Sequence, residues 1–253
     1  MQLITAHSGQ LQSLLASQLP PARHSSFVTG LEALDALAPN GCFVRGAIHE
    51  LLSPPSMPAP LTLALLLARS AAEGSIENQK PVLGKVEGSK IKNAIVWLDP
   101  KRCLYPPALA AAGIDLSRFF ILRPQDSMQT WSLAEVLRCR GVGAAIALVG
   151  KMMRVQARKL QLAAETGSST GILLRPAGKT SAVYAAATRW LVEPARGERT
   201  VQRWKIQLLH GHGGRVGQCV YLENCRERET ANSMRATDPL ADRSPETQVR
   251  RAS

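Results

Sequence analysis

Residues 144–175 read AAIALVGKMMRVQARKLQLAAETGSSTGILLR, and this stretch decides the fold. Its two ends, 144–149 and 171–175, are short and apolar, as buried strands are. Between them, residues 152–164 carry apolar side chains at helical spacing, which predicts a helix. A strand, a helix and a second strand in this order make up the unit from which parallel sheets are built.

The same alternation extends in both directions from this unit. Upstream, we expect strands at 46–52, 94–99 and 119–123, and helices at 31–37, 61–72, 107–112 and 129–140. Downstream, the apolar stretches 186–192, 204–209 and 218–222 are joined by glycine turns, which favours strands at an antiparallel edge. The sequence therefore predicts an α/β fold, with a mostly parallel sheet and helices on both of its faces.

Three segments fall outside this core, which we expect to span residues 26–224. Within the arm and connector at 1–25, helical spacing predicts an amphipathic helix that a partner could bind; its apolar face is made of Leu11, Leu14, Leu15 and Leu19. Residues 73–92 are polar and rich in glycine and lysine, so we expect a flexible surface insertion. Residues 225–253 contain almost no aliphatic side chains, and we expect a disordered tail.

The composition limits the class of protein. The 253 residues include 31 Lys+Arg and 19 Asp+Glu, a net charge of +12 that implies attraction to polyanions or acidic proteins. Aromatic residues make up only 4%, which argues against a base-stacking RNA platform. Five cysteines without a CxxC pair fit free thiols in a reducing compartment. No signal-peptide pattern is present and the apolar run at 61–68 is too short to span a bilayer, so we expect a cytoplasmic protein without membrane contact.

Several stretches resemble a known family. Residues 27–53 contain a TG pair, LEALDAL at 31–37, a glycine turn and RGAIHEL at 45–51, an order that resembles the entry into the RecA core. The segments LDPKRCLYPPALAAAGIDLSRFFILRP at 98–124, RKLQLAAE at 158–165 and LLRP at 173–176 are similar to the ImuA family. ImuA proteins are RecA-like accessory proteins of damage-induced mutagenesis, and the likeness covers roughly residues 25–210.

The resemblance implies a RecA-like sheet and a non-catalytic accessory factor of the SOS response. Such a factor acts in translesion DNA synthesis beside an ImuB-type Y-family polymerase homologue and an error-prone replicative-type polymerase, and RecA is a further implied partner. SulA-type cell-division inhibitors, which bind FtsZ, have the same degenerate core and are the alternative. An active RecA-type ATPase is less favoured.

The residues between the strand at 46–52 and the helix at 61–72 argue against ATP hydrolysis. A phosphate-binding loop needs GxxxxGK[ST], but here Ser53 and Pro58 replace the glycines, Ala59 replaces the lysine and Pro60 replaces the Ser/Thr. Four prolines also remove backbone N–H donors that would face the phosphates. Lys101 stands where the RecA pattern has its water-activating glutamate, and Gly150 or Lys151 where it has a Mg²⁺-orienting acid.

We therefore expect no catalytic residue, no cofactor and no metal site. Asp99, which ends the strand at 94–99, is interpreted as a turn or cap residue. Without such groups, we expect the function to be performed by surfaces of the protein and not by a catalytic pocket.

One group of cations stands out, because no acidic residue occurs between positions 138 and 160. On a helix from residue 151, Lys151, Arg154 and Arg158 would share one face, opposite Met153, Leu160 and Ala164. This pattern predicts a surface for DNA, bound without sequence preference, or for an acidic partner; a merely solvated helix face is the plainer alternative. The residues of this predicted surface are Lys151, Arg154, Arg158, Lys159, Arg138 and Arg140.

Overall fold

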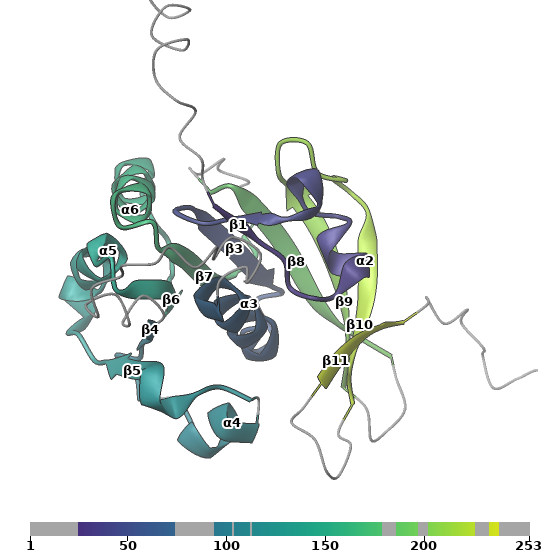
Figure 1. Ribbon diagram of the computed structural model, residues 1–253, viewed down its shortest axis with the longest axis horizontal. Helices are drawn as coiled ribbons and strands as arrows, with labels where there is room; N and C mark the ends of the chain where they lie inside the picture. The colour runs from purple at the N-terminus through teal and green to yellow at the C-terminus, as the bar shows by residue number, and fades with distance from the viewer. Residues whose placement is uncertain are drawn as a thin grey trace, which may run out of the picture.

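A nine-stranded sheet forms the centre of the computed structural model (Figure 1). The structure describes residues 25–73, 94–102, 104–111, 113–178, 186–196, 202–225 and 233–237. The spatial order of the strands is β11-β10-β9-β8-β3-β7-β6-β4-β5. Their bounds are β3 Ile48–Ser53, β4 Ala94–Leu98, β5 Phe119–Leu122, β6 Val142–Leu148, β7 Thr170–Pro176, β8 Thr188–Ala195, β9 Gln202–His210, β10 Cys219–Cys225 and β11 Ser233–Thr237.

The sheet has a parallel part and an antiparallel extension. The strands from β8 across β3, β7, β6 and β4 to β5 all run parallel to their neighbours. From β8 outward, β9, β10 and β11 pair antiparallel. Helices connect β3 to β4, β4 to β5, β5 to β6 and β6 to β7, as parallel strands require, whereas short turns suffice for antiparallel ones.

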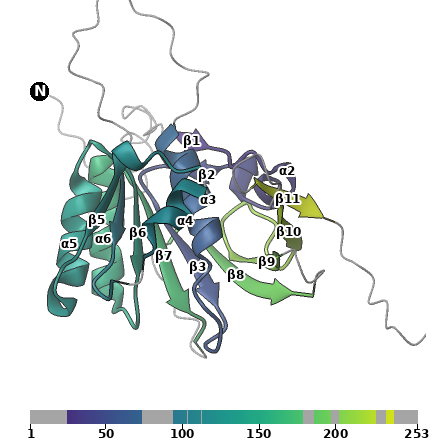
Figure 2. The ribbon, with the colours of Figure 1, turned by 90° about the horizontal axis from the view of Figure 1, so that it is seen from below.

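Helices cover both faces of the sheet (Figure 2). On one face lies α3 Leu61–Glu73, whose Leu63, Leu67 and Ala71 are buried in a core with Trp97 and Ile146 of the sheet. On the other face, α5 Gln129–Arg138 and α6 Arg154–Gly167 enclose a second core. The shorter helical segments are α2 Glu32–Asp35, η1 Pro39–Gly41, α4 Pro106–Ala111, η3 Leu116–Arg118 and η4 Asp126–Met128. The two cores confirm the predicted α/β class.

A small two-stranded sheet, which was not predicted from the sequence, packs beside β3. Strands β1 Ser26–Phe27 and β2 Phe43–Val44 pair antiparallel and bring two phenylalanine rings to a centroid distance of 5.6 Å. The ring of Phe43 also stacks on Trp190 of β8 at 5.6 Å. Tertiary aromatic packing thus stabilises strands too short to form alone.

Three expectations about the elements need correction. The helix expected from Met152 begins at Arg154, because Met153 is its extended N-cap and donates its N–H to the Gln156 side chain at 2.9 Å. The helix expected at 31–37 has regular geometry only over Glu32–Asp35. Part of the expected disordered tail, Ser233–Thr237, forms strand β11 through main-chain pairing with β10, which does not require aliphatic side chains.

Other expectations concern residues that the structure does not describe. The arm with Leu11, Leu14, Leu15 and Leu19 lies outside the described residues, as do residues 74–92 of the insertion and 226–232 and 238–253 of the tail. Within the described part of the chain, no helix is long and apolar enough to cross a membrane.

Candidate functional site

The loop from Pro54 to Pro60 connects β3 to α3, at the carboxyl ends of the parallel strands. In α/β sheets this edge is where ligands bind, and helix N-termini there can bind phosphate through free N–H groups. Few such groups are available here, because residues 54, 55, 58 and 60 are prolines. The N–H of Met57 donates to the Pro54 carbonyl at 2.9 Å, and that of Leu61 to the Ala59 carbonyl at 2.8 Å. Within residues 54–60, only Ser56 and Ala59 retain N–H groups that these turns do not use.

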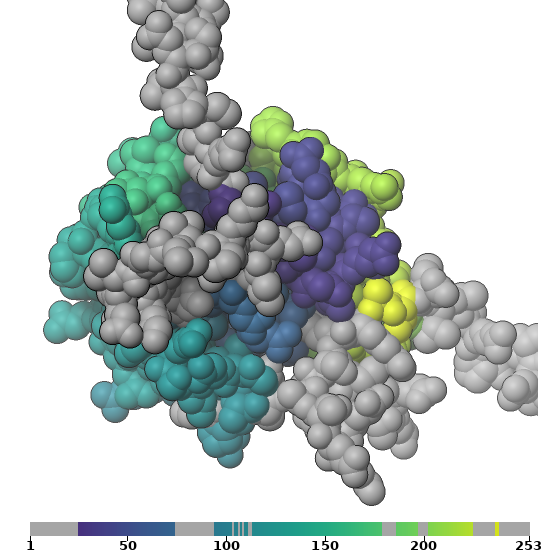
Figure 3. Space-filling view, in the orientation of Figure 1, coloured from purple at the N-terminus to yellow at the C-terminus, as the bar shows by residue number. Residues whose placement is uncertain are grey.

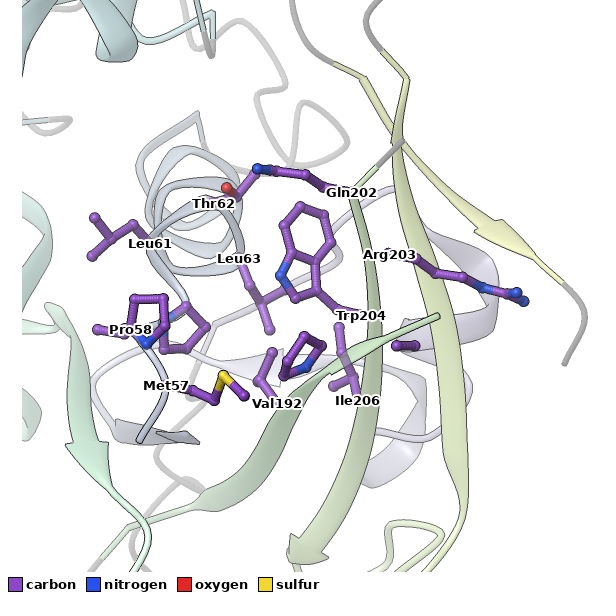
Figure 4. A pocket seen from close by; sticks show the side chains of 14 residues that line it. Met57, Pro58, Leu61, Thr62, Leu63, Val192, Gln202, Arg203, Trp204 and Ile206 are labelled. Carbon is purple, nitrogen blue, oxygen red and sulfur yellow. The ribbon is translucent and has the colours of Figure 1, made fainter. Parts of the chain in front are cut away.

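An apolar pocket of about 620 Å³ lies beside this loop, between α3 and the strands β8 and β9 (Figure 4). Trp204 of β9 projects into it opposite Leu63, and Met57 and Val192 line another side. The remaining lining residues are Pro58, Ala59, Pro60, Leu61, Thr62, Pro194, Ala195, Gln202, Arg203 and Ile206.

The charge distribution of the pocket does not suit a triphosphate. Arg203 contributes to the lining, but its side chain points away from the pocket (Figure 4). Its guanidinium lies 3.5 Å from a Glu223 carboxylate oxygen and 4.9 Å from the centre of the Tyr221 ring. The polar side chains left are Thr62 and Gln202, which are neutral. Transfer of a phosphate chain from water into such a lining would be costly, because its charge would lose hydration without gaining a counter-charge.

Asp99, Lys101, Gly150 and Lys151 are the residues that the sequence comparison with the RecA pattern singled out. Asp99 is buried at the end of β4, and its carboxylate accepts a hydrogen bond from the Leu104 N–H at 3.2 Å. This bond closes the local turn, in agreement with the interpretation of Asp99 as a turn residue. Lys101, Gly150 and Lys151 are all exposed. Among the described residues, no group of three or more His, Cys, Asp or Glu side chains is arranged to hold a metal ion.

The structure divides the six predicted cations into two groups. Arg154 stands at the start of α6, followed by Arg158 and Lys159, while Lys151 lies in the turn before it. Arg138 lies at the other end of α6, because a Cβ on Gly167 would come within 2.9 Å of the Arg138 carbonyl carbon. The thirteen-residue rise from Arg154 to Gly167 separates the two ends by about 20 Å. The six cations therefore do not form one continuous surface, since α5 and α6 pack side by side in the same direction.

Among the six cations, only Arg138 has its charge balanced by an acid that the structure describes. Arg138 forms an ion pair with Glu135, one turn earlier on α5. Lys151, Arg154, Arg158 and Lys159 form no ion pair with any described acid, and Arg158 instead donates to the Gln161 side-chain oxygen at 3.0 Å.

Two features of the site were missed from the sequence. Met153 was expected on the buried face, yet as N-cap it is 66% exposed, and Val155 and Leu162 are exposed as well. Helical spacing could have placed Val155 and Leu162 opposite the buried Leu160 and Ala164. The contribution of Trp204 to the pocket carried no sequence signal, since it comes from β9, far along the chain from the loop.

Comparison with known proteins finds relatives of this chain. The chain is similar to the protein named "Protein ImuA" in two strains of Caulobacter vibrioides, with 31% identity over 141 residues in each case. The match covers 49% of this chain and 58% of each relative, so the chain spans somewhat more than half the length of the curated relatives it matches. No family model matches the sequence. The similarity supports the expected membership of the ImuA family.

Proposed function

We propose that this chain, a member of the ImuA family, is a non-catalytic accessory protein of SOS-induced translesion DNA synthesis. Family membership supports an accessory role in SOS mutagenesis. The finer proposal is that the chain acts through protein–protein contacts. Its partners would be an ImuB-type Y-family polymerase homologue and an error-prone replicative-type polymerase, with RecA and non-specific DNA as further ligands.

The observation that carries the non-catalytic part is the loop between β3 and α3. A phosphoryl-transfer site stabilises charge with backbone N–H groups, a lysine, a metal ion and a residue that positions water. Here prolines and two internal turns occupy the loop, and the adjacent pocket is apolar. A fold of the RecA type that lacks these groups retains only its surfaces for function.

A nucleotide-binding measurement tests the non-catalytic proposal. We expect the melting temperature of the protein to stay unchanged when millimolar ATP and Mg²⁺ are added. A ligand at a hundred times its dissociation constant would add about 2.7 kcal/mol to the free energy of unfolding, a clear upward shift. A RecA protein measured in parallel is the positive control. Stabilisation by ATP, or release of phosphate above background, would overturn this part of the proposal.

A competition pull-down tests the accessory role. The protein is immobilised and offered an ImuB-type protein and FtsZ in the same lysate. Retention of the ImuB-type protein alone is the expected result. Retention of FtsZ alone would assign the chain to the SulA-like division inhibitors and contradict the proposal.

A further inference from the structure

Four unbalanced cations surround the first two turns of α6. Lys151, Arg154, Arg158 and Lys159 are all exposed, and none forms an ion pair within the part of the chain that the structure describes. The first turn of the helix contains no acid, so the side-chain charges add to the positive end of the helix dipole. This end of the helix therefore has a positive potential that an anionic partner would neutralise.

Apolar side chains occupy the middle of the same face. Val155 is 78% exposed and Leu162 is 46% exposed, and the seven-residue interval between them places both on one side of the helix. Arg158 and Lys159 lie between them along the helix, and Met153 lies exposed at its start. The opposite side, with Leu160, Ala163 and Ala164, is buried in the core. Figure 3 shows α6 on the outside of the molecule, in the view of Figure 1.

The mixture of charge and apolar surface distinguishes between two kinds of polyanion. A nucleic-acid backbone is bound by cations through its phosphates, and single strands add stacking on aromatic rings. Neither contact uses Val155 or Leu162, and no aromatic side chain lies within α6. A protein helix with an apolar stripe bordered by acids would use both, because it would bury the two aliphatic side chains and pair with the cations around them.

We propose that this surface binds an acidic amphipathic helix of a partner protein. We define the α6 surface as Met153, Arg154, Val155, Arg158, Lys159 and Leu162. The apolar stripe of the partner helix lies along Val155 and Leu162, and its Asp and Glu side chains face the arginines and the lysine. This inference rests on the proposed function, because it assigns a contact surface to the accessory role.

Two double variants separate the apolar contribution from the charge. Val155→Gln with Leu162→Gln keeps every charge and replaces two exposed side chains by good helix formers, so the fold is preserved. Arg154→Glu with Arg158→Glu reverses the local charge. Arg138→Glu with Arg140→Glu makes the same change of charge at the other end of the α5–α6 pair and is the matched control.

The affinity of each variant for purified ImuB-type protein and for a fluorescent single-stranded oligonucleotide is then measured by titration. We expect both α6-surface variants to bind the ImuB-type protein at least about tenfold more weakly, because substitutions at the centre of an interface commonly have effects of this size. The control variant should bind with the affinity of the wild type. The deficit of the charge variant should shrink as salt rises, and that of the glutamine variant should persist.

Other results overturn the inference in distinguishable ways. Unchanged affinity of the glutamine variant for the ImuB-type protein contradicts it while the proposed function stands. If the glutamine variant is normal and the charge variant loses only oligonucleotide binding, the α6 surface is a DNA surface. If the wild-type chain does not bind the ImuB-type protein at all, the proposed function and this inference fail together.

Discussion

The Glu50 carboxylate on β3 accepts a hydrogen bond of 2.7 Å from Nε of Arg189 on β8, 139 residues further along the chain. On its other side it accepts a second bond, of 2.8 Å, from Arg175 of β7. The Glu50 side chain is 1% exposed and both arginine side chains are 10% exposed. The ion pairs thus connect β3 to its two neighbouring strands, β7 and β8. At β8 the sheet changes from parallel pairing with β3 to antiparallel pairing with β9.

Replacement of Glu50 should therefore be strongly destabilising. Glu50, Arg175 and Arg189 form a buried triad of charges, and Glu50→Gln removes its only negative charge. Because two largely buried guanidinium groups then lose this partner, we expect a cost of about 3–5 kcal/mol, as for other buried ion pairs from which one partner is removed. Glu135→Gln removes the partner of Arg138 in a half-exposed pair, and we expect at most about 1 kcal/mol there. Urea denaturation of both variants measures their free energies of unfolding. Equal losses of this free energy would contradict the prediction.

Several parallel strands could be predicted because β3, β4, β5 and β6 are each a short, largely apolar run followed by a helical pattern. Which strands pair with each other could not be predicted, and the triad of Glu50, Arg175 and Arg189 shows why. Glu50 lies in β3, and the α-helices α3 to α6 separate it along the chain from Arg175 of β7, with a further loop before Arg189 of β8. Local patterns contain no information on which strands become neighbours, so the burial of these three charges appears only in the folded chain.

The candidate site was predictable in its chemistry but not in its shape. The loss of a phosphate-binding loop follows from residue types alone, since proline and alanine cannot supply the required groups. The apolar pocket depends on Trp204 reaching the loop from β9, which is a tertiary relationship. The separation of Arg138 from Arg154 likewise depends on α5 and α6 packing with the same direction, which sequence spacing does not show.

Gly167, the last residue of α6, permits the close approach of α5. A Cβ at this position would lie 2.0 Å from the Leu137 carbonyl oxygen, which belongs to the backbone and cannot move aside cheaply. We expect Gly167→Ala to lower the free energy of unfolding by about 1–3 kcal/mol, as overpacking does. Gly150→Ala is the matched control, because a Cβ there meets nothing within 4 Å. Thermal unfolding of both variants checks the prediction, and a Gly167 variant as stable as the control would refute it.

Asp35 fixes the turn that precedes α2. Its Oδ1 accepts the Thr29 hydroxyl at 2.8 Å and the Thr29 N–H at 2.9 Å, and the carboxylate is buried. Asp35→Ala would leave a buried N–H and hydroxyl of Thr29 without this acceptor, which costs about 1–3 kcal/mol. Glu32→Ala, on the exposed side of the same helix, should change stability by less than about 0.5 kcal/mol. Chemical denaturation would distinguish the two variants, and similar midpoints would show that the turn does not depend on Asp35.

His49 is held neutral inside an aromatic cluster. It is fully buried on β3, where its ring meets Phe43 in an edge-on contact at 5.4 Å and lies near Phe27 at 6.3 Å. Nε2 donates to the Val44 carbonyl at 2.9 Å, which leaves Nδ1 to accept from the Thr188 hydroxyl at 2.8 Å. The Thr188 oxygen in turn accepts the indole N–H of Trp190 at 2.8 Å. This chain of hydrogen bonds is satisfied only by the neutral imidazole.

The stability of the protein should therefore fall on mild acidification. Burial lowers the pKa of His49 from 6.5 to about 4, although its bond to Val44 partly offsets the effect. Between these two values the unfolded chain binds the proton and the folded chain does not, so stability is complete above pH 6.5 and decreases as the pH falls toward 4. The expected contribution is a loss of about 2 kcal/mol between pH 7 and pH 5. His49→Gln, which can donate to Val44 and accept from Thr188 without titrating, is the control. The wild-type loss, measured by urea unfolding at both pH values, should exceed that of the variant by this amount, and parallel losses would mean that His49 is not the group responsible.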